Sequence, residues 1–398
     1  ILQRGTPYMD GVSSKKSLFS SLFLLDFYLI VFVYDTVITQ CPIDPHTVFE
    51  YRFVANEPGT HIYHAHSGIQ RADGLFGALI VDDYQNDTSA AYDFDLAEHV
   101  IIVIDWTNVT AMEKFNGHFH NNMDNKANDI LINGRGSLER FVVTDPSSLN
   151  ASDVVYTPKA TFRVERNKRY RFRLINVGVL YCPIEFSIDA HNLTVIASDG
   201  KPFEPIEVES LIIYAGERFD FVLDANQPAQ NYWIRAKGLA DCSPHKSYQT
   251  AILSYLDGDD TWPSGYDTIQ YDTMGRKGLQ LNPYNKMLDS ANRNDFIALD
   301  TLRGAANSDY IDSFYKEILT NDTRKIKKFY FAMEFNKINN PDFNDETHYP
   351  LSMMSSVRRQ NIYTPQINNI SFRMPSFPLL YKWNQVPNVN SFTSFFFT

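Results

Sequence analysis

Several segments of this 398-residue chain alternate between apolar and polar side chains with a period of two residues. In segment 169–174, Tyr, Phe and Leu alternate with three arginines, and segments 49–53 and 219–223 show similar patterns. Successive side chains of a β-strand point to opposite faces, so this alternation is typical of strands with one buried face. Few segments carry the 3.6-residue period of a helix. The pattern therefore predicts an all-β protein.

Composition limits the class of partner. The chain has 36 Lys and Arg against 47 Asp and Glu, which gives a net charge of −11. There is no basic patch, so a nucleic-acid partner is not expected. The length is sufficient for two or three domains with a large core.

A pair of histidines is the main candidate for chemistry. His64 and His66 lie two residues apart in a segment that otherwise looks like a strand. Their side chains should point to the same face, about 7 Å apart along the backbone. Two neighbouring imidazoles can each bind one ion of a close metal pair, and imidazole suits copper, zinc and iron. The alternative is two strand histidines held by hydrogen bonds, because a bare His-x-His is a weak motif.

The surrounding sequence is more specific. Segment 59–81 reads GTHIYHAHSGIQRADGLFGALIV and resembles the second copper-binding motif of laccases, which are multicopper oxidases; it is most similar to the arthropod type. The segments GTPYMDGV at 5–12 and TQCPI at 39–43 resemble the same first domain. The segments ILINGRG at 130–136, YRFRLIN at 170–176 and FSIDAHN at 186–192 resemble the second.

This resemblance implies tandem cupredoxin-like (plastocyanin-like) Greek-key sandwiches. We expect a first, incomplete cupredoxin domain at 1–85, a second at 95–258, a linker at 259–325 and the start of a third at 326–398. A strand is expected at 328–335, and the segment 117–124, with the pair His118 and His120, is interpreted as a polar loop.

An apolar insertion at 13–35 interrupts the first domain, where the family has only a few residues. Its Phe, Leu and Ser content is typical of a translated pyrimidine-rich intron. A genuine insertion and a membrane segment are the alternatives, although the apolar run is short and contains Asp26.

The resemblance implies a copper enzyme with four ions that oxidises diphenols or similar aromatic reductants by one-electron steps and reduces O₂ to water. Of the family's cluster ligands, His64 and His66 match, whereas the other motifs fall outside these 398 residues. Two histidines cannot hold a copper cluster, so the chain by itself is expected to be inactive.

The resemblance assigns further roles. Asp10 matches an acidic residue that relays protons near the cluster, and Glu185 matches a carboxylate of the phenol pocket, although fungal members place it differently. Cys41 and Cys182 match the pair that joins the first two domains, which leaves Cys242 as the odd cysteine. His61 and His191 are expected to have structural roles.

Six Asn-x-Ser/Thr motifs fit a secreted, glycosylated protein. They begin at Asn86, Asn108, Asn150, Asn192, Asn321 and Asn369. A membrane association is not expected. Two other functions remain open: a non-catalytic extracellular cupredoxin-repeat pseudoenzyme or binding module, and a membrane-anchored ferroxidase of the same superfamily.

Overall fold

The structure is a computed structural model. It describes residues 7–10, 43, 46, 48–55, 57–66, 69–82, 91–121, 124–136, 140–142, 154–156, 158–258, 261–263, 269–276, 278–284, 295–304, 329–338 and 362–371. The insertion predicted at 13–35 and the cysteine Cys41 lie outside these residues.

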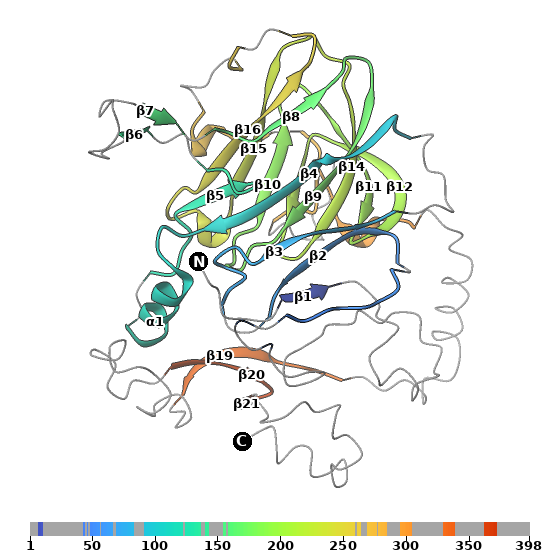
Figure 1. Cartoon of the computed structure of the whole chain (residues 1–398). Coiled ribbons are helices and arrows are strands. Elements are labelled where there is room, and N and C mark those ends of the chain that lie inside the picture. Colours follow the sequence, from blue (N-terminus) through green and yellow to red (C-terminus); the bar gives the residue numbers. More distant parts are fainter. Residues whose placement is uncertain are drawn as a thin grey trace, which may run out of the picture.

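Two sheets packed face to face form the largest body of the molecule (Figure 1). The six-stranded sheet has the order β12 (Lys201–Val208), β11 (Leu193–Ser198), β14 (Arg218–Asp224), β9 (Arg169–Asn176), β4 (Phe94–Trp106) and β5 (Asp129–Ile132). The seven-stranded sheet has the order β18 (Phe296–Ile297), β17 (Gln280–Leu281), β13 (Ser210–Ile213), β10 (Ile184–Ile188), β15 (Asn231–Gly238), β16 (Tyr248–Tyr255) and β8 (Thr161–Val164). We call this body the sandwich.

Aromatic side chains from both sheets fill the core of the sandwich. The rings of Phe172 on β9 and Phe221 on β14 stack with centroids 5.4 Å apart, and Phe186 on β10 of the other sheet lies 5.9 Å from Phe221. All three side chains are fully buried. The alternation seen in the sequence thus places one face of each strand in the core, and the prediction of an all-β fold is confirmed.

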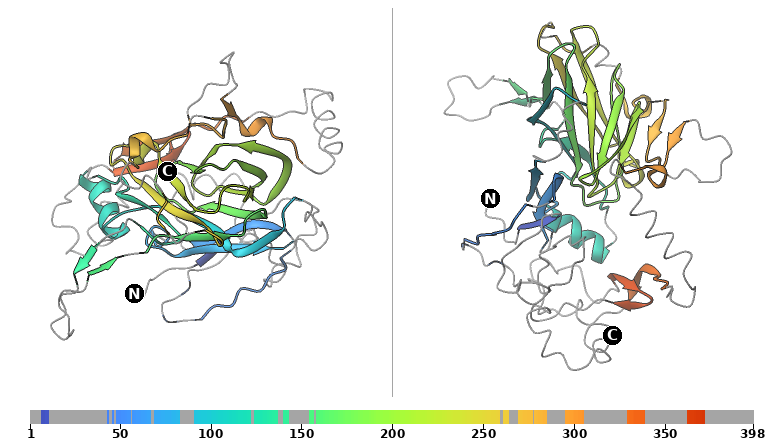
Figure 2. Two further views of the ribbon diagram at one scale, coloured as in Figure 1. Left: turned by 90° about the horizontal axis from the view of Figure 1, so that it is seen from above. Right: turned by 90° about the vertical axis from the view of Figure 1, so that its right-hand side faces the viewer.

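A smaller antiparallel sheet, which we call the first sheet, lies against the sandwich (Figures 1 and 2). It has the order β1 (Pro7–Asp10), β2 (Gly59–Ala65) and β3 (Phe76–Val81). Ile62 of β2 packs with Ile104, Ile175 and Val177 of the sandwich in a buried apolar cluster. The first sheet and the sandwich therefore share a small core of their own.

The stretch 259–325, predicted as a linker, contributes short strands to the sandwich. β17 pairs in parallel with β13, and β18 pairs in parallel with β17, so both extend one edge of the seven-stranded sheet. Short 3₁₀ turns lie at Tyr271–Thr273 and Leu299–Thr301. Two-residue strands leave too weak a pattern to be seen in a sequence.

The remaining elements lie outside the sandwich. β6 (Arg140–Val142) pairs with β7 (Val154–Tyr156), and a further sheet joins β19 (Met333–Ile338), β20 (Ile362–Ile367) and β21 (Ile370–Ser371). The segment predicted as a polar loop at 117–124 instead belongs largely to helix α1 (Ala111–Asn121). No helix in the described part of the chain combines the length and apolar character needed to cross a bilayer.

Candidate metal centre

The two predicted histidines lie at the end of β2. His64 is the penultimate residue of the strand and is 2% exposed, whereas His66 follows the strand and is exposed. Their rings lie side by side, with centroids 5.6 Å apart and planes inclined by 27°. The i, i+2 spacing has therefore placed two imidazoles next to each other at the edge between buried and exposed surface.

A backbone contact orients the His64 ring. Its Nδ1 lies 3.0 Å from the carbonyl oxygen of Ala65, to which a protonated Nδ1 donates. In the neutral ring this tautomer places on Nε2 the lone pair through which an imidazole binds a metal.

A pocket of about 810 Å³ opens beside the pair. His64, His66 and His118 line it, the last coming from helix α1. Its wall includes the apolar residues Ile69, Phe115 and Leu180, together with Tyr181 and four charged groups, Arg71, Lys114, Asp105 and Asp241. The position of His118 was missed in the sequence because it depends on α1, whose polar sequence was interpreted as a loop.

Asp105 is the most deeply buried acid of this pocket. It is 3% exposed, and its carboxylate accepts hydrogen bonds from the backbone N–H groups of Val179 and Leu180, at 3.0 and 2.9 Å. Burial outweighs these hydrogen bonds and raises its pKa to about 6. In the sequence, the one indication that Asp105 belongs to the site is the position of an acid near the end of the apolar run 99–106.

Asp10 and Glu185, the two acids assigned by resemblance, lie in different places. Asp10 ends β1, where its backbone is paired with Ile62 of β2. Glu185 lies on β10, and its Oε1 accepts a hydrogen bond of 3.0 Å from the backbone N–H of Arg276. Glu185 does not line the pocket beside His64. Their predicted roles remain predictions.

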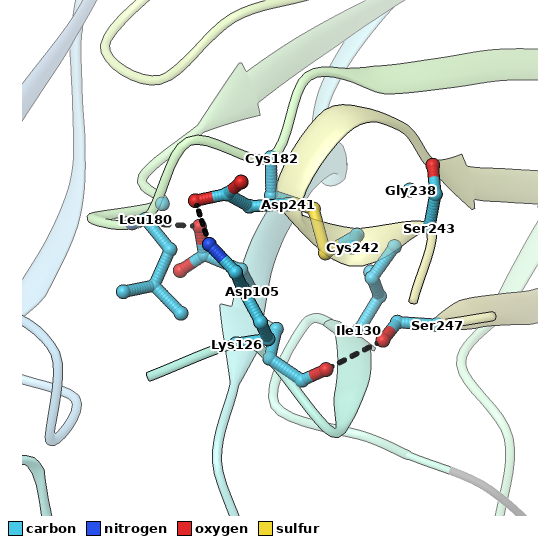
Figure 3. Close-up of a disulfide and its surroundings, with 12 residues drawn as sticks. Asp105, Lys126, Ile130, Leu180, Cys182, Gly238, Asp241, Cys242, Ser243 and Ser247 are labelled. Atoms are coloured by element: carbon cyan, nitrogen blue, oxygen red, sulfur yellow. Dashed lines mark hydrogen bonds and ion pairs between the residues drawn. A yellow bond between two sulfur atoms is a disulfide. The ribbon is translucent and has the colours of Figure 1, made fainter. Parts of the chain in front are cut away.

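The disulfide differs from the one expected. Cys182 is bonded to Cys242, with Cα atoms 5.3 Å apart, so the predicted pairing of Cys41 with Cys182 is wrong in this structure (Figure 3). The reason is proximity: Cys242 lies in a 3₁₀ turn (Ala240–Cys242), and the N–H of Asp241 donates to the carbonyl of Tyr181. This contact brings the two cysteine backbones together within the sandwich.

Other buried histidines have structural surroundings. His191 bridges the carbonyl of Asp189 and the hydroxyl of Tyr255, at 2.7 and 2.8 Å. His61, 4% exposed, lies 2.9 Å from the carbonyl of Glu57, and burial lowers its pKa. Neither ring lines the pocket beside His64.

Three of the six predicted glycosylation motifs fall on described residues. Asn108, Asn192 and Asn369 are all exposed, and Asn192 donates from Nδ2 to Glu207. Asn86, Asn150 and Asn321 lie outside the described residues.

Comparison with known proteins agrees with this architecture. A family model described as multicopper oxidase matches residues 97–258, and a second one matches residues 35–86. Laccase-2 of Agaricus bisporus is 37% identical over 233 residues, which make up 57% of this chain and 42% of that protein. Laccase-1 of Pleurotus ostreatus is 38% identical over 231 residues, covering 57% of this chain and 39% of that protein.

Solved structures give the same result. The laccase from Botrytis aclada matches with a TM-score of 0.52 at 30% identity, over 66% of this chain and 45% of that one. Fet3p, a multicopper oxidase that functions in iron import, matches with a TM-score of 0.56 at 17% identity, which shows a common fold. The chain spans less than half the length of the curated relatives named here.

The paired sheets and the strand that ends in two histidines thus define a cupredoxin-type protein. Both family models and the laccase relatives then identify the family. The chain belongs to the multicopper oxidase family.

The family implies copper as the cofactor. Imidazole nitrogen is a ligand that copper prefers, and the adjacent rings of His64 and His66 fit that preference. Among the residues that the structure describes, no cluster of three or more His, Cys, Asp or Glu side chains could hold a metal ion. The assignment of His64 and His66 as copper ligands remains a prediction.

Proposed function

We propose that this chain is part of a laccase-like oxidase, which oxidises diphenols or similar aromatic reductants in one-electron steps coupled to reduction of O₂ to water. The adjacent rings of His64 and His66, within a sequence of the multicopper oxidase family, carry this proposal. Copper, when bound, would supply the one-electron chemistry.

The residues of this chain would bind copper, hold a proton and face the substrate. His64 would bind through Nε2, because the hydrogen bond to Ala65 keeps the proton on Nδ1. His66, exposed at the pocket, would bind beside it. Asp10 would hold a proton near the cluster, and Glu185 would face an aromatic substrate; both roles rest on the resemblance to laccases.

This chain by itself is proposed to lack oxidase activity, because two imidazoles cannot complete the coordination of a copper pair and the described residues hold no cluster of three or more His, Cys, Asp or Glu side chains that could bind a metal ion. We also propose that the protein is secreted and carries glycans at exposed motifs such as Asn108 and Asn192. A non-catalytic extracellular binding module is the second candidate function, supported by the lack of a cluster of three or more His, Cys, Asp or Glu side chains among the described residues.

Copper titration of the purified chain tests the ligand assignment. Cu(II) binding is followed by electron paramagnetic resonance in the native chain, in the double variant His64→Ala/His66→Ala, and in His245→Ala as an exposed histidine control. We expect the double variant to lose a bound copper that the control retains. Equal copper binding in all three would refute the assignment of the pair.

Measurement with an oxygen electrode tests the proposal that the chain by itself lacks oxidase activity. With copper and a simple diphenol such as catechol, the chain should consume no O₂ above the rate of free copper. Turnover that disappears in the double variant would show that the isolated chain is already an oxidase.

A further inference from the structure

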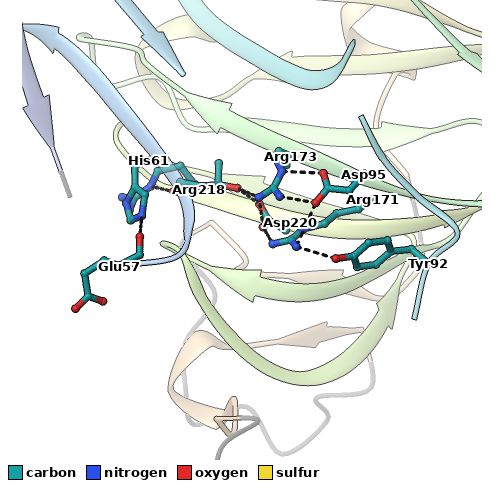
Figure 4. A network of polar contacts seen from close by, with 9 residues as sticks. Glu57, His61, Tyr92, Asp95, Arg171, Arg173, Arg218 and Asp220 are labelled. Carbon is teal, nitrogen blue, oxygen red and sulfur yellow. Dashed lines mark hydrogen bonds and ion pairs between the residues drawn. The ribbon is translucent and has the colours of Figure 1, made fainter. Parts of the chain in front are cut away.

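A cluster of four charged residues lies on the face of the six-stranded sheet that meets the first sheet (Figure 4). Arg171 and Arg173 of β9 face Asp95 of β4 and Asp220 of β14. Arg173 Nε lies 3.1 Å from Asp95, and Arg173 Nη1 lies 3.3 Å from Asp220. Arg171 Nη2 lies 2.5 Å from Asp220. Two positive and two negative charges thus balance one another within the sandwich.

One side chain of the first sheet enters this cluster. Thr60 of β2 is fully buried; its hydroxyl donates to Asp220 Oδ1 at 2.6 Å and accepts from Arg173 Nη1 at 2.8 Å. Its carbonyl oxygen accepts a further hydrogen bond of 3.0 Å from Arg218 Nε. Three residues of the sandwich therefore fix both the backbone and the side chain at this position.

The same face of β2 leads directly to the metal ligand. Thr60, Ile62 and His64 are alternate residues of one strand, and each is at most 2% exposed. Thr60 binds the charged cluster, Ile62 packs with Ile104 and Ile175 of the sandwich, and His64 reaches the pocket. Thr60 and His64 are about 13 Å apart along the strand, given a rise of about 3.3 Å per residue.

A close backbone approach holds the start of the strand. Gly59 has a φ of +128°, and a Cβ placed on it would lie 2.5 Å from the Cα of Gly200 in the turn between β11 and β12. Gly59, the residue before Thr60, therefore lies so close to the sandwich that a larger residue would not fit in its place.

We propose that Thr60 is a positioning residue: through its hydroxyl, the Asp220–Arg173 pair of the sandwich sets the register and tilt of β2 and thereby the place of the His64 imidazole. This inference rests on the proposed function only for the role of His64 as a copper ligand. The contacts that support it stand without copper.

Substitution of Thr60 tests the proposal. Thr60→Val keeps the branched shape and removes the hydroxyl, Thr60→Ser keeps the hydroxyl, and Thr60→Cys offers a weaker donor. Thr161→Val on β8, an exposed strand position with one long contact to the carbonyl of Lys159, is the matched control. Histidine labelled with ¹³C at Cε1 reports the ring of His64, whose resonance is assigned with His64→Gln.

We expect Thr60→Val to shift the His64 resonance and to raise hydrogen exchange at the amides of 61–65 by roughly tenfold, since two buried groups lose a partner. Thr60→Ser and the control should keep native values. Thr60→Cys, which keeps a weak donor and acceptor at this position, should give an intermediate shift even if Thr60→Val does not fold.

Cu(II) titration of the same proteins separates the two proposals. If Thr60→Val shifts His64 but His64→Gln leaves copper binding unchanged, the proposed function fails and the positioning role stands. A native His64 resonance and native exchange in folded Thr60→Val would overturn the positioning role, whatever the copper result.

Discussion

Arg71 and Asp105 bind the same four-residue stretch of backbone, one through its carbonyls and the other through its amides. Arg71 donates from Nε to the carbonyl of Val177 and from Nη2 to that of Gly178, both at 3.0 Å. Asp105 accepts from the N–H groups of the next two residues, Val179 and Leu180. Because Arg71 follows the histidine pair in the chain, this contact joins the segment after β2 to the sandwich beside the pocket.

Removal of the Arg71 guanidinium should weaken the contact between the segment after β2 and the sandwich. Arg71→Met keeps the aliphatic stem and leaves two carbonyls without their donor, so we expect the free energy of unfolding to fall by about 2 kcal/mol. Urea unfolding followed by tryptophan fluorescence measures it. Arg135→Met, at an exposed turn position, is the control and should change stability by less than about 0.5 kcal/mol. Equal stability of both variants would contradict the role given to Arg71.

Asp105 should make stability fall as pH rises. Its pKa is about 6 in the folded protein against an ordinary 3.8, so between these values the unfolded chain releases a proton that the folded protein keeps. The unfolded state is favoured progressively across this window, by at most about 3 kcal/mol at pH 7.

Asp105→Asn removes the titration, so the variant should lose less stability than the native chain between pH 4 and pH 7. Urea unfolding at steps of half a pH unit gives the difference. Asp257→Asn, at an exposed position, should follow the native curve. Parallel curves for native and Asp105→Asn would show that Asp105 does not titrate in this range.

The Cys182–Cys242 bond can be checked by peptide mapping without reduction. Mass spectrometry should find the peptides of these two cysteines joined. A joined peptide containing Cys41 and Cys182 would instead support the pairing implied by the laccase resemblance. Because the two cysteines are 60 residues apart, Cys242→Ser should reduce the free energy of unfolding by about 4 kcal/mol on the chain-entropy model.

Complementary DNA from the natural source tests the hypothesis of a translated intron. Transcripts should lack the codons of 13–35 and join Val12 directly to the segment that begins at Thr36. A mature transcript that keeps these codons would show that the insertion belongs to the protein.

The strands at segments 169–174 and 219–223 were predicted correctly because burial of one face imposes a two-residue period that survives without an alignment. The strand expected at segment 49–53 was wrong, because this segment forms no strand and Phe49 is 50% exposed, so its alternation faces no core. Tyr170, Phe172 and Leu174 do point into the core. Their polar neighbours were harder to interpret. Arg173 is 2% exposed because β2 and the charged cluster cover the second face of β9, and no period in one strand reveals what packs over it.

Residues of the candidate site that lie within one segment were found in the sequence. Residues that depend on contacts between distant segments were missed. His64 and His66 lie within a single motif, so their spacing was sufficient to place them together. The roles of Thr60 and Asp105 depend on partners far along the chain, such as Asp220 and Leu180. The disulfide was wrong for the same reason: a pairing taken from resemblance does not include the turn that brings Cys242 to Cys182.

Both bonded cysteines belong to the sandwich. The bond between Cys182 and Cys242 does not depend on the histidine strand, since neither cysteine belongs to the first sheet. In the part of the chain that the structure describes, that strand meets the sandwich through contacts such as those of Thr60 and Ile62, which can form and break reversibly. The disulfide thus constrains the scaffold itself, whereas in the described part of the chain non-covalent contacts alone hold the histidine strand against it.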